Sequence, residues 1–375
     1  MQIYTFEACG FWPTNLLLCN MKKFLAALGS LILFSACDNE IDINAEYKDM
    51  TIMYGMLNPV MDTNYVRIQR GYLGDDAASA SYGISDSLYY DSTEIDVFIR
   101  EYNPGASTFN QEVELIWDNS IPLDSGIYTD EGYHLYRIPS NFPIQSSREY
   151  EIVVNRADGS VASARTGIVG SINITRPLPI ITARYFDGRL QFNVRQDTDG
   201  NDPQATEKMI AYQPILYFHY KEYNKSTGSE VFKTETIRLP LEENPFDQID
   251  ILFSGNELYS ALAARIEEDP SKNILRFFIG MDVEIIGASE ELMTFIELSK
   301  PSTGVNQNRP QYEQVINGTG ILSSRTFARR NDCRLQQSIY DRMLESGIIC
   351  DLNFARVELG GTDTCYCIDN QKVCF

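Results

Sequence analysis

The chain has 375 residues, of which 43% are hydrophobic and 22% are charged, a composition that excludes a disordered chain and allows two domains of ordinary size. Its 52 Asp and Glu outnumber its 31 Lys and Arg, and the formal net charge of −21 disfavours nucleic acid as a partner, because binding to phosphates requires an excess of cations. With His134 and His219 as its two histidines, imidazole catalysis and histidine-rich metal sites are also disfavoured. The 22 Tyr and 19 Phe favour strands.

The first predicted element is a leader for export. Two lysines precede the apolar run 24–36, which ends at Cys37. A run of this length forms a helix of about 20 Å, too short for the ~30 Å hydrocarbon core of a membrane. Residues 21–36 are therefore predicted to be a cleaved signal peptide and not a membrane anchor. Residues 1–20 precede a leader that is complete without them, and we interpret them as an artefact of an upstream start site.

Cys37 and the two small residues before it, Ser35 and Ala36, resemble a bacterial lipobox. In that motif the leader is removed and the thiol carries fatty acyl chains such as palmitate, and the resemblance implies the same modification of Cys37. Two acyl chains give lasting attachment to a membrane where a single chain does not. The alternative is an ordinary secretory leader cut nearby, with Cys37 incidental.

Residues 37–50 are an acidic stretch without strong periodicity, which predicts a solvated tether. An acidic stretch directly after the lipidated cysteine also resembles the surface-export signal of Bacteroidota lipoproteins. That resemblance implies a protein anchored in the outer membrane and displayed at the cell surface. An orientation that faces the periplasm is the alternative.

Residues 51–175 predict an antiparallel β-sandwich, either Ig-like or transthyretin-like. Short runs alternate apolar and polar residues, which is typical of strands with one exposed face, and turn residues such as Asn103-Pro104-Gly105 separate them. Regular spacing of such runs without a helical pattern indicates a sandwich. The predicted strands are Met53–Leu57, Tyr65–Arg70, Ile95–Arg100, Val113–Trp117, Tyr133–Ile138, Tyr150–Val154 and Val161–Val169.

A second β-rich domain is predicted over residues 176–332, with two or three helical insertions. Pro177 and Pro179 mark the boundary, because two prolines in three residues stiffen the chain and end strand pairing. Helical spacing of apolar residues predicts helices over 258–266 and 289–299, and a third within 333–345. The predicted strands are Ile180–Tyr185, Leu190–Arg195, Pro214–Tyr223, Glu230–Leu239 and Ile274–Ile286. The cysteine-rich segment 333–375 is expected to pack on this domain.

The leader, the acidic tether and several short motifs resemble a known group of proteins. The motifs are Met53–Leu57 followed by Asn58-Pro59, then Tyr65–Ile68 and Gly71–Gly74, and finally the Gly-Thr-Gly-Ile segment within Asn317–Ser324. They resemble the two-domain lipoproteins of Bacteroidota that have no assigned function and are often encoded near TonB-dependent receptors. The resemblance covers most of the exported chain and implies a lipoprotein that assists uptake or attachment. It brings no catalytic residues, and the cysteine-rich end departs from the pattern.

The five cysteines of the last segment predict two disulfides and one remaining thiol, because clustered cysteines in an exported protein are read first as disulfides. A hairpin around residues 369–372 would bring Cys367 opposite Cys374, and Cys350 would then pair with Cys333 or Cys365. A structural zinc site is the alternative, although the usual Cys-x₂-Cys spacing is missing.

An acidic loop offers weak calcium candidates, namely Asp197, Asp199, Asn201 and Asp202. The loop does not follow the EF-hand register, since the sixth position is not Gly and the twelfth is not Glu. Such a pattern more commonly indicates an ordinary acidic hairpin loop. We therefore expect no bound metal and no cofactor.

The motifs of the common hydrolases are absent, so no catalytic residue is predicted. Both histidines fall within predicted strands and are interpreted as sheet-face residues. Aromatic side chains suited to stacking on sugars are present, although cross-strand packing is their commoner role. These candidates are Tyr82, Tyr89, Tyr90 and Trp117.

These observations predict a non-enzymatic lipoprotein that binds a partner at the cell surface. The partners expected are the membrane, through the lipid anchor, and either a TonB-dependent transporter or a surface glycan. A fimbrial or adhesin subunit is the alternative, and it would lose its first strand to proteolysis and regain one in assembly. A glycan hydrolase that uses two carboxylates is a weaker alternative.

Overall fold

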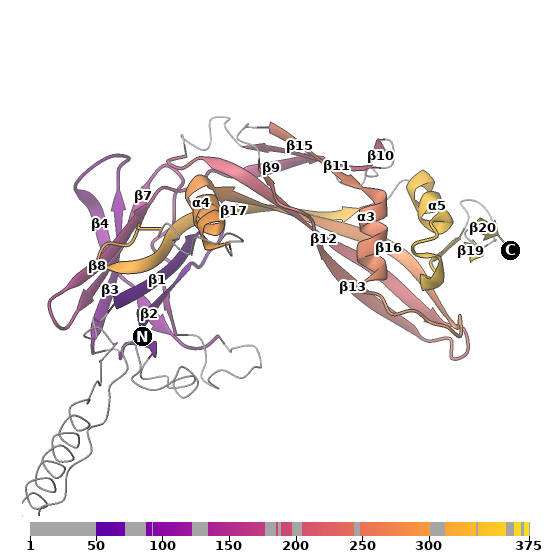
Figure 1. The fold of residues 1–375 in the computed structure, drawn as a ribbon, viewed down its shortest axis with the longest axis horizontal. Helices are drawn as coiled ribbons and strands as arrows, with labels where there is room; N and C mark the ends of the chain where they lie inside the picture. The colour runs from indigo at the N-terminus through magenta and orange to yellow at the C-terminus, as the bar shows by residue number, and fades with distance from the viewer. Residues whose placement is uncertain are drawn as a thin grey trace, which may run out of the picture. The chain divides into compact units, whose positions relative to one another are not determined.

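A computed structural model describes residues 50–71, 88–91, 93–121, 134–176, 185–186, 189–196, 205–243, 248–300, 312–334, 337–357, 364–368 and 371–374. These residues form a mainly β structure with three helices, as the composition and the alternating pattern predict (Figure 1). None of the helices in the described part is long and apolar enough to span a bilayer. Cys37, Tyr82 and the calcium candidates 197–202 lie outside the described residues.

The largest sheet has nine strands, in the order β13-β12-β16-β17-β1-β2-β6-β5, with β14 paired to β12. All pairs in it are antiparallel except β1 with β17, which is parallel. Its strands are β1 (Met50–Leu57), β2 (Tyr65–Gly71), β5 (Ile116–Asp118), β6 (Leu135–Arg137), β12 (Met209–Asn224), β13 (Glu230–Arg238), β14 (Glu242–Glu243), β16 (Ile274–Ser289) and β17 (Gly318–Cys333).

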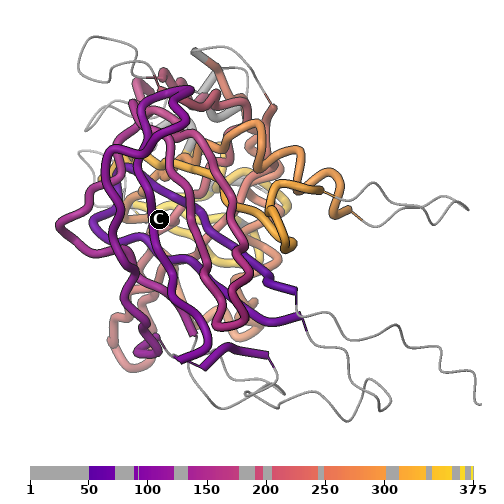
Figure 2. The backbone as a smooth tube through the Cα atoms, turned by 90° about the vertical axis from the view of Figure 1, so that its left-hand side faces the viewer, coloured from indigo at the N-terminus to yellow at the C-terminus, as the bar shows by residue number. Residues whose placement is uncertain are grey.

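Three smaller sheets complete the fold. One runs β4-β3-β7-β8, a second runs β10-β11-β15 with β9 also paired to β11, and the third runs β18-β19-β20. Figure 2 shows the N-terminal strands in indigo to magenta facing the viewer. The strands are β3 (Ile95–Tyr102), β4 (Phe109–Glu114), β7 (Glu149–Arg156), β8 (Val161–Thr166), β9 (Ile172–Arg176), β10 (Tyr185–Phe186), β11 (Arg189–Gln196), β15 (Gln248–Ser254), β18 (Ala355–Val357), β19 (Thr364–Ile368) and β20 (Gln371–Cys374).

The segment predicted as one strand over Val113–Trp117 is two strands that belong to different sheets. Strand β4 pairs with β3, whereas β5 pairs with β6. The chain changes sheet at Leu115, which is 5% exposed and whose backbone N–H donates to Val97 O at 2.8 Å. The alternation of apolar residues is the same in both halves, so it does not reveal the change of sheet.

The parallel pair β1–β17 depends on a glycine. Thr51 lies opposite Gly318 and Leu57 opposite Ser324, so the first described strand pairs with a strand near the end of the chain. Gly320 has a φ of +115°, and a Cβ built there would lie 1.9 Å from Met53 O. A side chain at this position would therefore clash with the backbone of β1, and glycine alone permits the close approach.

Two hydrophobic cores stabilise the described chain. One contains buried side chains of β1, β2, β3, β7 and β8 together with Val315 and Leu322, and the other extends from Val169 through β9, β11, β12, β15 and β16 to Cys365. The predicted boundary at residue 176 stays a prediction, and the nine-stranded sheet contains strands from both sides of it. Strand β17 contributes to both cores, through Leu322 at one end and Cys333 at the other.

The three predicted helices are present, each close to its predicted start. Helix α3 (Gly255–Ala263) begins with a capping box between Ser254 and Glu257, and α4 (Glu290–Ser299) begins where the Ser289 side chain accepts from the N–H of Leu292. Helix α5 (Gln337–Glu345) leads into the short 3₁₀ turn η1 (Cys350–Leu352).

Arg276 on β16 holds the C-terminal segment against the second core. It is 3% exposed, and its guanidinium donates to Glu222 Oε1 at 2.9 Å, Leu352 O at 2.7 Å and Glu267 O at 2.8 Å. The Oε2 atom of Glu222 in turn lies 2.8 Å from Lys233 Nζ. A fully buried cation is tolerated here because each of its three nitrogens donates to a carboxylate or a carbonyl.

Candidate functional site

One face of the nine-stranded sheet is left open along β13, β12, β16 and β17. Most side chains on this face are half-buried or exposed, although Ile215 and Ala288 on it are buried. The alternate residues, such as Phe218 and Val283, are fully buried in the second core. Cross-strand register places Tyr217 between Thr236 and Asp282. We call this surface the open face, and it consists of Phe232, Thr234, Thr236, Tyr217, His219, Lys221, Asp282, Glu284, Ile286, Arg325, Phe327 and Arg329.

The centre of the open face is an ion-pair network around Asp282. Arg329 Nη2 lies 2.8 Å from Asp282 Oδ2, and its guanidinium lies 4.4 Å from the centroid of the Tyr217 ring. Burial alone would raise the pKa of Asp282, but the hydrogen bonds from Arg329, the backbone of Asp332 and His219 outweigh it and lower the pKa. The network therefore keeps this carboxylate charged and fixed in place.

His219 is a sheet-face residue with both ring nitrogens engaged. Its Nε2 lies 3.4 Å from Asp282 Oδ2, and its Nδ1 lies 2.8 Å from Thr234 Oγ1 on the neighbouring strand. Because both nitrogens already have partners, the ring is held in one orientation and is not presented as a free base.

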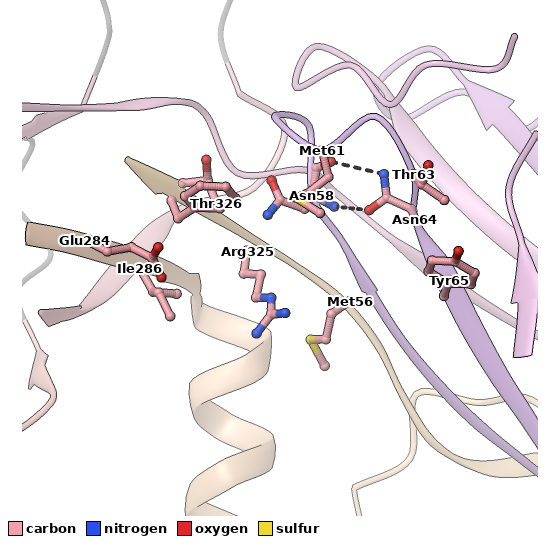
Figure 3. Close-up of a pocket in the computed structure, with 11 residues that line it drawn as sticks. Met56, Asn58, Met61, Thr63, Asn64, Tyr65, Glu284, Ile286, Arg325 and Thr326 are labelled. Atoms are coloured by element: carbon pink, nitrogen blue, oxygen red, sulfur yellow. Dashed lines mark hydrogen bonds between the residues drawn. The ribbon is translucent and has the colours of Figure 1, made fainter. Parts of the chain in front are cut away.

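A pocket of about 380 Å³ lies at the end of the open face, where β1 leaves the side of β17 (Figure 3). This volume is within the range of sites that bind small molecules or the side chains of a partner. Its wall combines apolar, amide and charged groups from β1, the β1–β2 loop, β16 and β17. The lining residues are Met56, Asn58, Met61, Thr63, Asn64, Tyr65, Glu284, Ile286, Arg325, Thr326 and Phe327.

The loop that forms one wall of the pocket is held by two asparagines. The backbone N–H of Asn58 donates to Asn64 Oδ1 at 2.7 Å, and Asn64 Nδ2 donates back to Asn58 O at 3.1 Å. The N–H of Val60 donates to Asn58 Oδ1 at 3.1 Å. Together with the backbone bond from the N–H of Met61 to Asn58 O at 3.3 Å, these side-chain bonds hold the loop, so this wall is preformed.

Arg325 supplies the pocket with a cation that has no partner among the described residues. Figure 3 shows its side chain between Met56 on one side and Glu284 and Ile286 on the other. Arg325 lies opposite Ala288, whereas Glu284 lies opposite Arg329. Four residues of strand separate the two positions by about 13 Å. Glu284 Oε2 lies 4.0 Å from Nη1 of Arg329, whose guanidinium also pairs with Asp282. An exposed, unpaired guanidinium beside apolar side chains suits a carboxylate or an aromatic group of a partner.

The lining of this pocket includes a single carboxylate, Glu284. Glycoside hydrolysis by the usual mechanism uses a pair of carboxylates, which this lining does not present. Within the part of the chain that the structure describes, no group of three or more His, Cys, Asp or Glu side chains could hold a metal ion.

A second group of half-buried acids lies near the start of α4. Burial, followed by repulsion from Glu291 and Glu290, raises the pKa of Glu207 to about 7. Burial also raises the pKa of Glu291, although hydrogen bonds from Thr166 Oγ1 at 2.9 Å and Gln314 Nε2 at 3.1 Å partly offset the effect. Neither carboxylate has a cation within ion-pair distance among the described residues.

The predicted number of disulfides is found, but the predicted pairing is wrong. Cys350 pairs with Cys367 and Cys365 pairs with Cys374, while Cys333 is free and fully buried. The cause is the hairpin register: Ile368 lies opposite Gln371, so the turn has two residues and places Cys374 opposite Cys365. A four-residue turn would have placed it opposite Cys367. Burial raises the pKa of the Cys333 thiol to about 11, so this thiol stays protonated.

Most of the aromatic side chains suggested for sugar stacking take part in packing. Tyr89 and Tyr90 are 8% and 6% exposed, and the ring of His134 stacks on Tyr89 at 4.0 Å. Trp117 is 44% exposed and meets His134 edge-on at 5.8 Å. Of the described candidates, Trp117 therefore keeps the largest accessible surface.

Sequence reasoning missed the pocket and its central residue, Arg325. The signal available was weak, because an arginine that alternates with buried residues on a strand is also the pattern of an ordinary solvated face. What distinguishes Arg325 is the departure of β1 at Leu57, which leaves the neighbouring space empty. That departure is a property of the fold and not of the local sequence.

Comparisons with solved structures include a weak likeness to a biofilm-associated protein domain. No family model matches the chain, and no curated protein matches its sequence. Among solved structures it is similar to "Biofilm associated protein - BSP domain", with 9% sequence identity and a TM-score of 0.14, over 76% of this chain and 60% of that one. The chain thus spans 60% of the length of that structure. A likeness at this score carries no argument about fold or function.

Proposed function

We propose that the protein is a lipid-anchored, non-enzymatic binding module of the bacterial outer membrane, which holds a partner against its open face. The observation that carries this proposal is the pocket at the end of that face, with Arg325 unpaired on its wall. Hydrogen bonds of Asn58 and Asn64 hold one wall of the pocket in place, so little conformational entropy is lost in that wall when a partner binds.

Two features support an extracytoplasmic location. Cys350–Cys367 and Cys365–Cys374 are disulfides, and such bonds persist in oxidising compartments. The leader and Cys37 resemble a lipobox, and lipidation at this position would anchor the chain through two acyl chains. The proposed N-terminal domain is a sandwich of Ig-like or transthyretin-like type, which is consistent with one core shared between β1–β2 and β3–β7–β8.

The partner that we favour is a TonB-dependent transporter, because the lipoproteins that this chain resembles are often encoded near such receptors. A surface glycan is the second candidate. It is supported by Trp117, whose ring is 44% exposed and could stack on a sugar.

Partner binding is tested by affinity capture from native membranes in mild detergent. The wild-type chain is expected to recover a transporter, identified by mass spectrometry. Arg325→Glu is expected to lower the recovery at least fivefold, because it places a carboxylate where a cation meets the partner. Lys225→Glu is the matched control, since it makes the same charge change in the hairpin turn after β12, and it should leave recovery within twofold. Recovery with Arg325→Glu that equals the wild-type recovery would show that the pocket is not part of the binding surface.

The anchor is tested separately by mass spectrometry of the mature N-terminus. A diacylated Cys37 is expected, and Cys37→Ser should release the protein from the membrane fraction. A mature chain that begins further along would contradict the anchor and favour the fimbrial subunit. Failure of a transporter to appear in the capture, with Cys37 acylated, would contradict the transporter and leave the glycan to be tested on an array.

A further inference from the structure

Strand β13 is an edge of the nine-stranded sheet, and no described strand pairs with its outer side. It is nine residues long, pairs with β12 without a bulge, and contains no proline. Phe232 and Val231 are 71% and 51% exposed. Exposed edges of this kind form pairs with other chains unless charges or irregularities prevent it.

The outward-facing backbone groups of β13 can be identified from its pairing with β12. The N–H of Asn224 donates to Ser229 O at 3.0 Å, and the N–H of Leu239 donates to Pro214 O at 2.9 Å. Hydrogen-bonded and non-hydrogen-bonded pairs alternate along an antiparallel ladder. The odd-numbered residues of β13 therefore bond to β12, and the even-numbered residues, from Glu230 to Arg238, point their N–H and C=O groups outward.

When two copies of β13 run in opposite directions, the charges of one copy are complementary to those of the other. The sequence Glu-Val-Phe-Lys-Thr-Glu-Thr-Ile-Arg is centred on Thr234. When it is paired antiparallel with a second copy about that residue, Glu230 faces Arg238 and Lys233 faces Glu235. Opposite charges placed directly across an antiparallel pair are stabilising, whereas like charges there are destabilising.

The neighbouring registers lack this complementarity. A two-residue shift in one direction places Lys233 opposite itself, and the same shift in the other direction places Glu235 opposite itself. One-residue shifts pair an outward-facing backbone group with an inward-facing one and lose the ladder. The register centred on Thr234 is compatible with both the backbone and the charges, and it provides about ten hydrogen bonds.

We propose that β13 is a homodimer interface, in which two copies of the chain pair their β13 strands antiparallel about a two-fold axis at Thr234. Such an interface is isologous, so each charge pair occurs twice. The pairing joins the two nine-stranded sheets edge to edge and covers the exposed Val231 and Phe232.

The charges that favour this pairing are available for it. Arg238 has no hydrogen bond or ion pair with any described residue. Glu230 lies 2.8 Å from Lys221 Nζ and Lys233 lies 2.8 Å from Glu222, but both side chains are exposed and keep further hydrogen-bonding positions. One strand pair buries less area than a standard interface, so we expect a dimer with a Kd on the order of 10⁻⁵ M.

Cysteine cross-linking of the full chain tests the register directly. Thr234→Cys places a thiol on the two-fold axis, where Cα atoms of a hydrogen-bonded pair are about 5.5 Å apart, a distance that a disulfide spans. Thr236→Cys is the matched control on the same face, and its two copies would lie about 13 Å apart. Mild oxidation should produce at least tenfold more covalent dimer from Thr234→Cys than from Thr236→Cys, above the background of the wild-type cysteines. Equal yields would overturn the proposal.

Charge reversal tests the interface without relying on cross-links. Sedimentation velocity in mild detergent should show that Arg238→Glu weakens dimerisation at least tenfold. The variant places a carboxylate opposite Glu230 of the second copy, and the two-fold axis repeats this repulsive pair. The double variant Glu230→Arg with Arg238→Glu should recover at least half of the dimer, and Lys225→Glu, outside the strand, should behave as wild type. A wild-type chain that stays monomeric at about 100 μM, or a double variant without recovery, would contradict the β13 dimer.

Discussion

Two groups of carboxylates that are buried or half-buried differ in whether a cation accompanies them. Glu222 on β12 lies between Arg276 and Lys233, whereas Glu207 and Glu291 lie beside each other near α4 without a cation. Burial alone would raise the pKa of Glu222, but the hydrogen bonds from Lys233 and Arg276 lower it overall, while the pKa of Glu207 rises to about 7. The chain has fewer cations than carboxylates. Arg276, which is buried beside the second core, pairs with Glu222 and also holds the C-terminal segment through Leu352 O.

The comparison predicts that the largest loss of stability comes from Arg276→Met. The change leaves Glu222 with one partner and strips the carbonyls of Leu352 and Glu267 of their donor. We expect the free energy of unfolding in urea to fall by about 3 to 5 kcal/mol, the cost of breaking a buried ion pair on one side. Arg265→Met, at an exposed arginine that donates only to Ala261 O, should cost less than about 0.5 kcal/mol. A cost below about 1 kcal/mol for Arg276→Met would contradict the role of this residue in holding the C-terminal segment against the second core.

Glu207→Gln is expected to stabilise the protein, but only at higher pH. The folded-state pKa of Glu207, about 7, lies above its ordinary value of 4.5, so its contribution to stability is complete below pH 4.5 and is lost as the pH rises through 7. The neutral amide removes this loss. Urea unfolding at pH 8 should show a gain of about 1 to 2 kcal/mol, reduced from the full linkage value because the side chain is partly exposed.

The same measurement at pH 5 should show a much smaller gain for Glu207→Gln, because the pH-dependent loss of stability, which starts near the ordinary pKa of 4.5, has only begun there. Glu222→Gln should have the opposite sign, since the lowered pKa of Glu222 contributes stability above its ordinary value that is lost as the pH falls. Gains of equal size at pH 5 and pH 8 for Glu207→Gln would show that packing, and not charge, is responsible.

Thr166→Val should have the smallest effect of these changes. Thr166 is 2% exposed and its Oγ1 donates to Glu291 Oε2, so the variant should lose about 1 kcal/mol. Thr326→Val is a matched control, because the Oγ1 of Thr326 is buried without a hydrogen-bond partner. It should be neutral or stabilising in thermal and urea unfolding, and equal losses for the two variants would contradict the assigned bond.

Local features of this fold could be predicted from the sequence. The alternating pattern of the strands and the helical spacing of apolar residues report on interactions within a few residues, and these elements are present. The number of disulfides also followed from counting cysteines in an exported chain. Each of these inferences depends on neighbours in the sequence, where spacing alone fixes the geometry.

Features that depend on distant partners could not be predicted. The disulfide pairing turned on a two-residue difference in the length of the hairpin turn. The segment 113–117 was predicted as one strand, although it belongs to two, because alternation does not specify a sheet. The pocket exists because β1 ends while β17 continues. The residues around Arg325 in the sequence give no information on where β1, which is distant in the chain, ends.

The parallel pair β1–β17 has a consequence for the order of events in folding. Thr51 is among the first described residues to leave the ribosome, whereas its partner Gly318 follows 318 − 51 = 267 residues later. Leu322 belongs to the same hydrophobic core as Met53 and Val66, so that core stays incomplete until nearly the whole chain has been made. Contacts of such long sequence separation make folding slow and leave apolar strands exposed in the meantime. The nascent chain therefore depends on protection from aggregation for most of its synthesis.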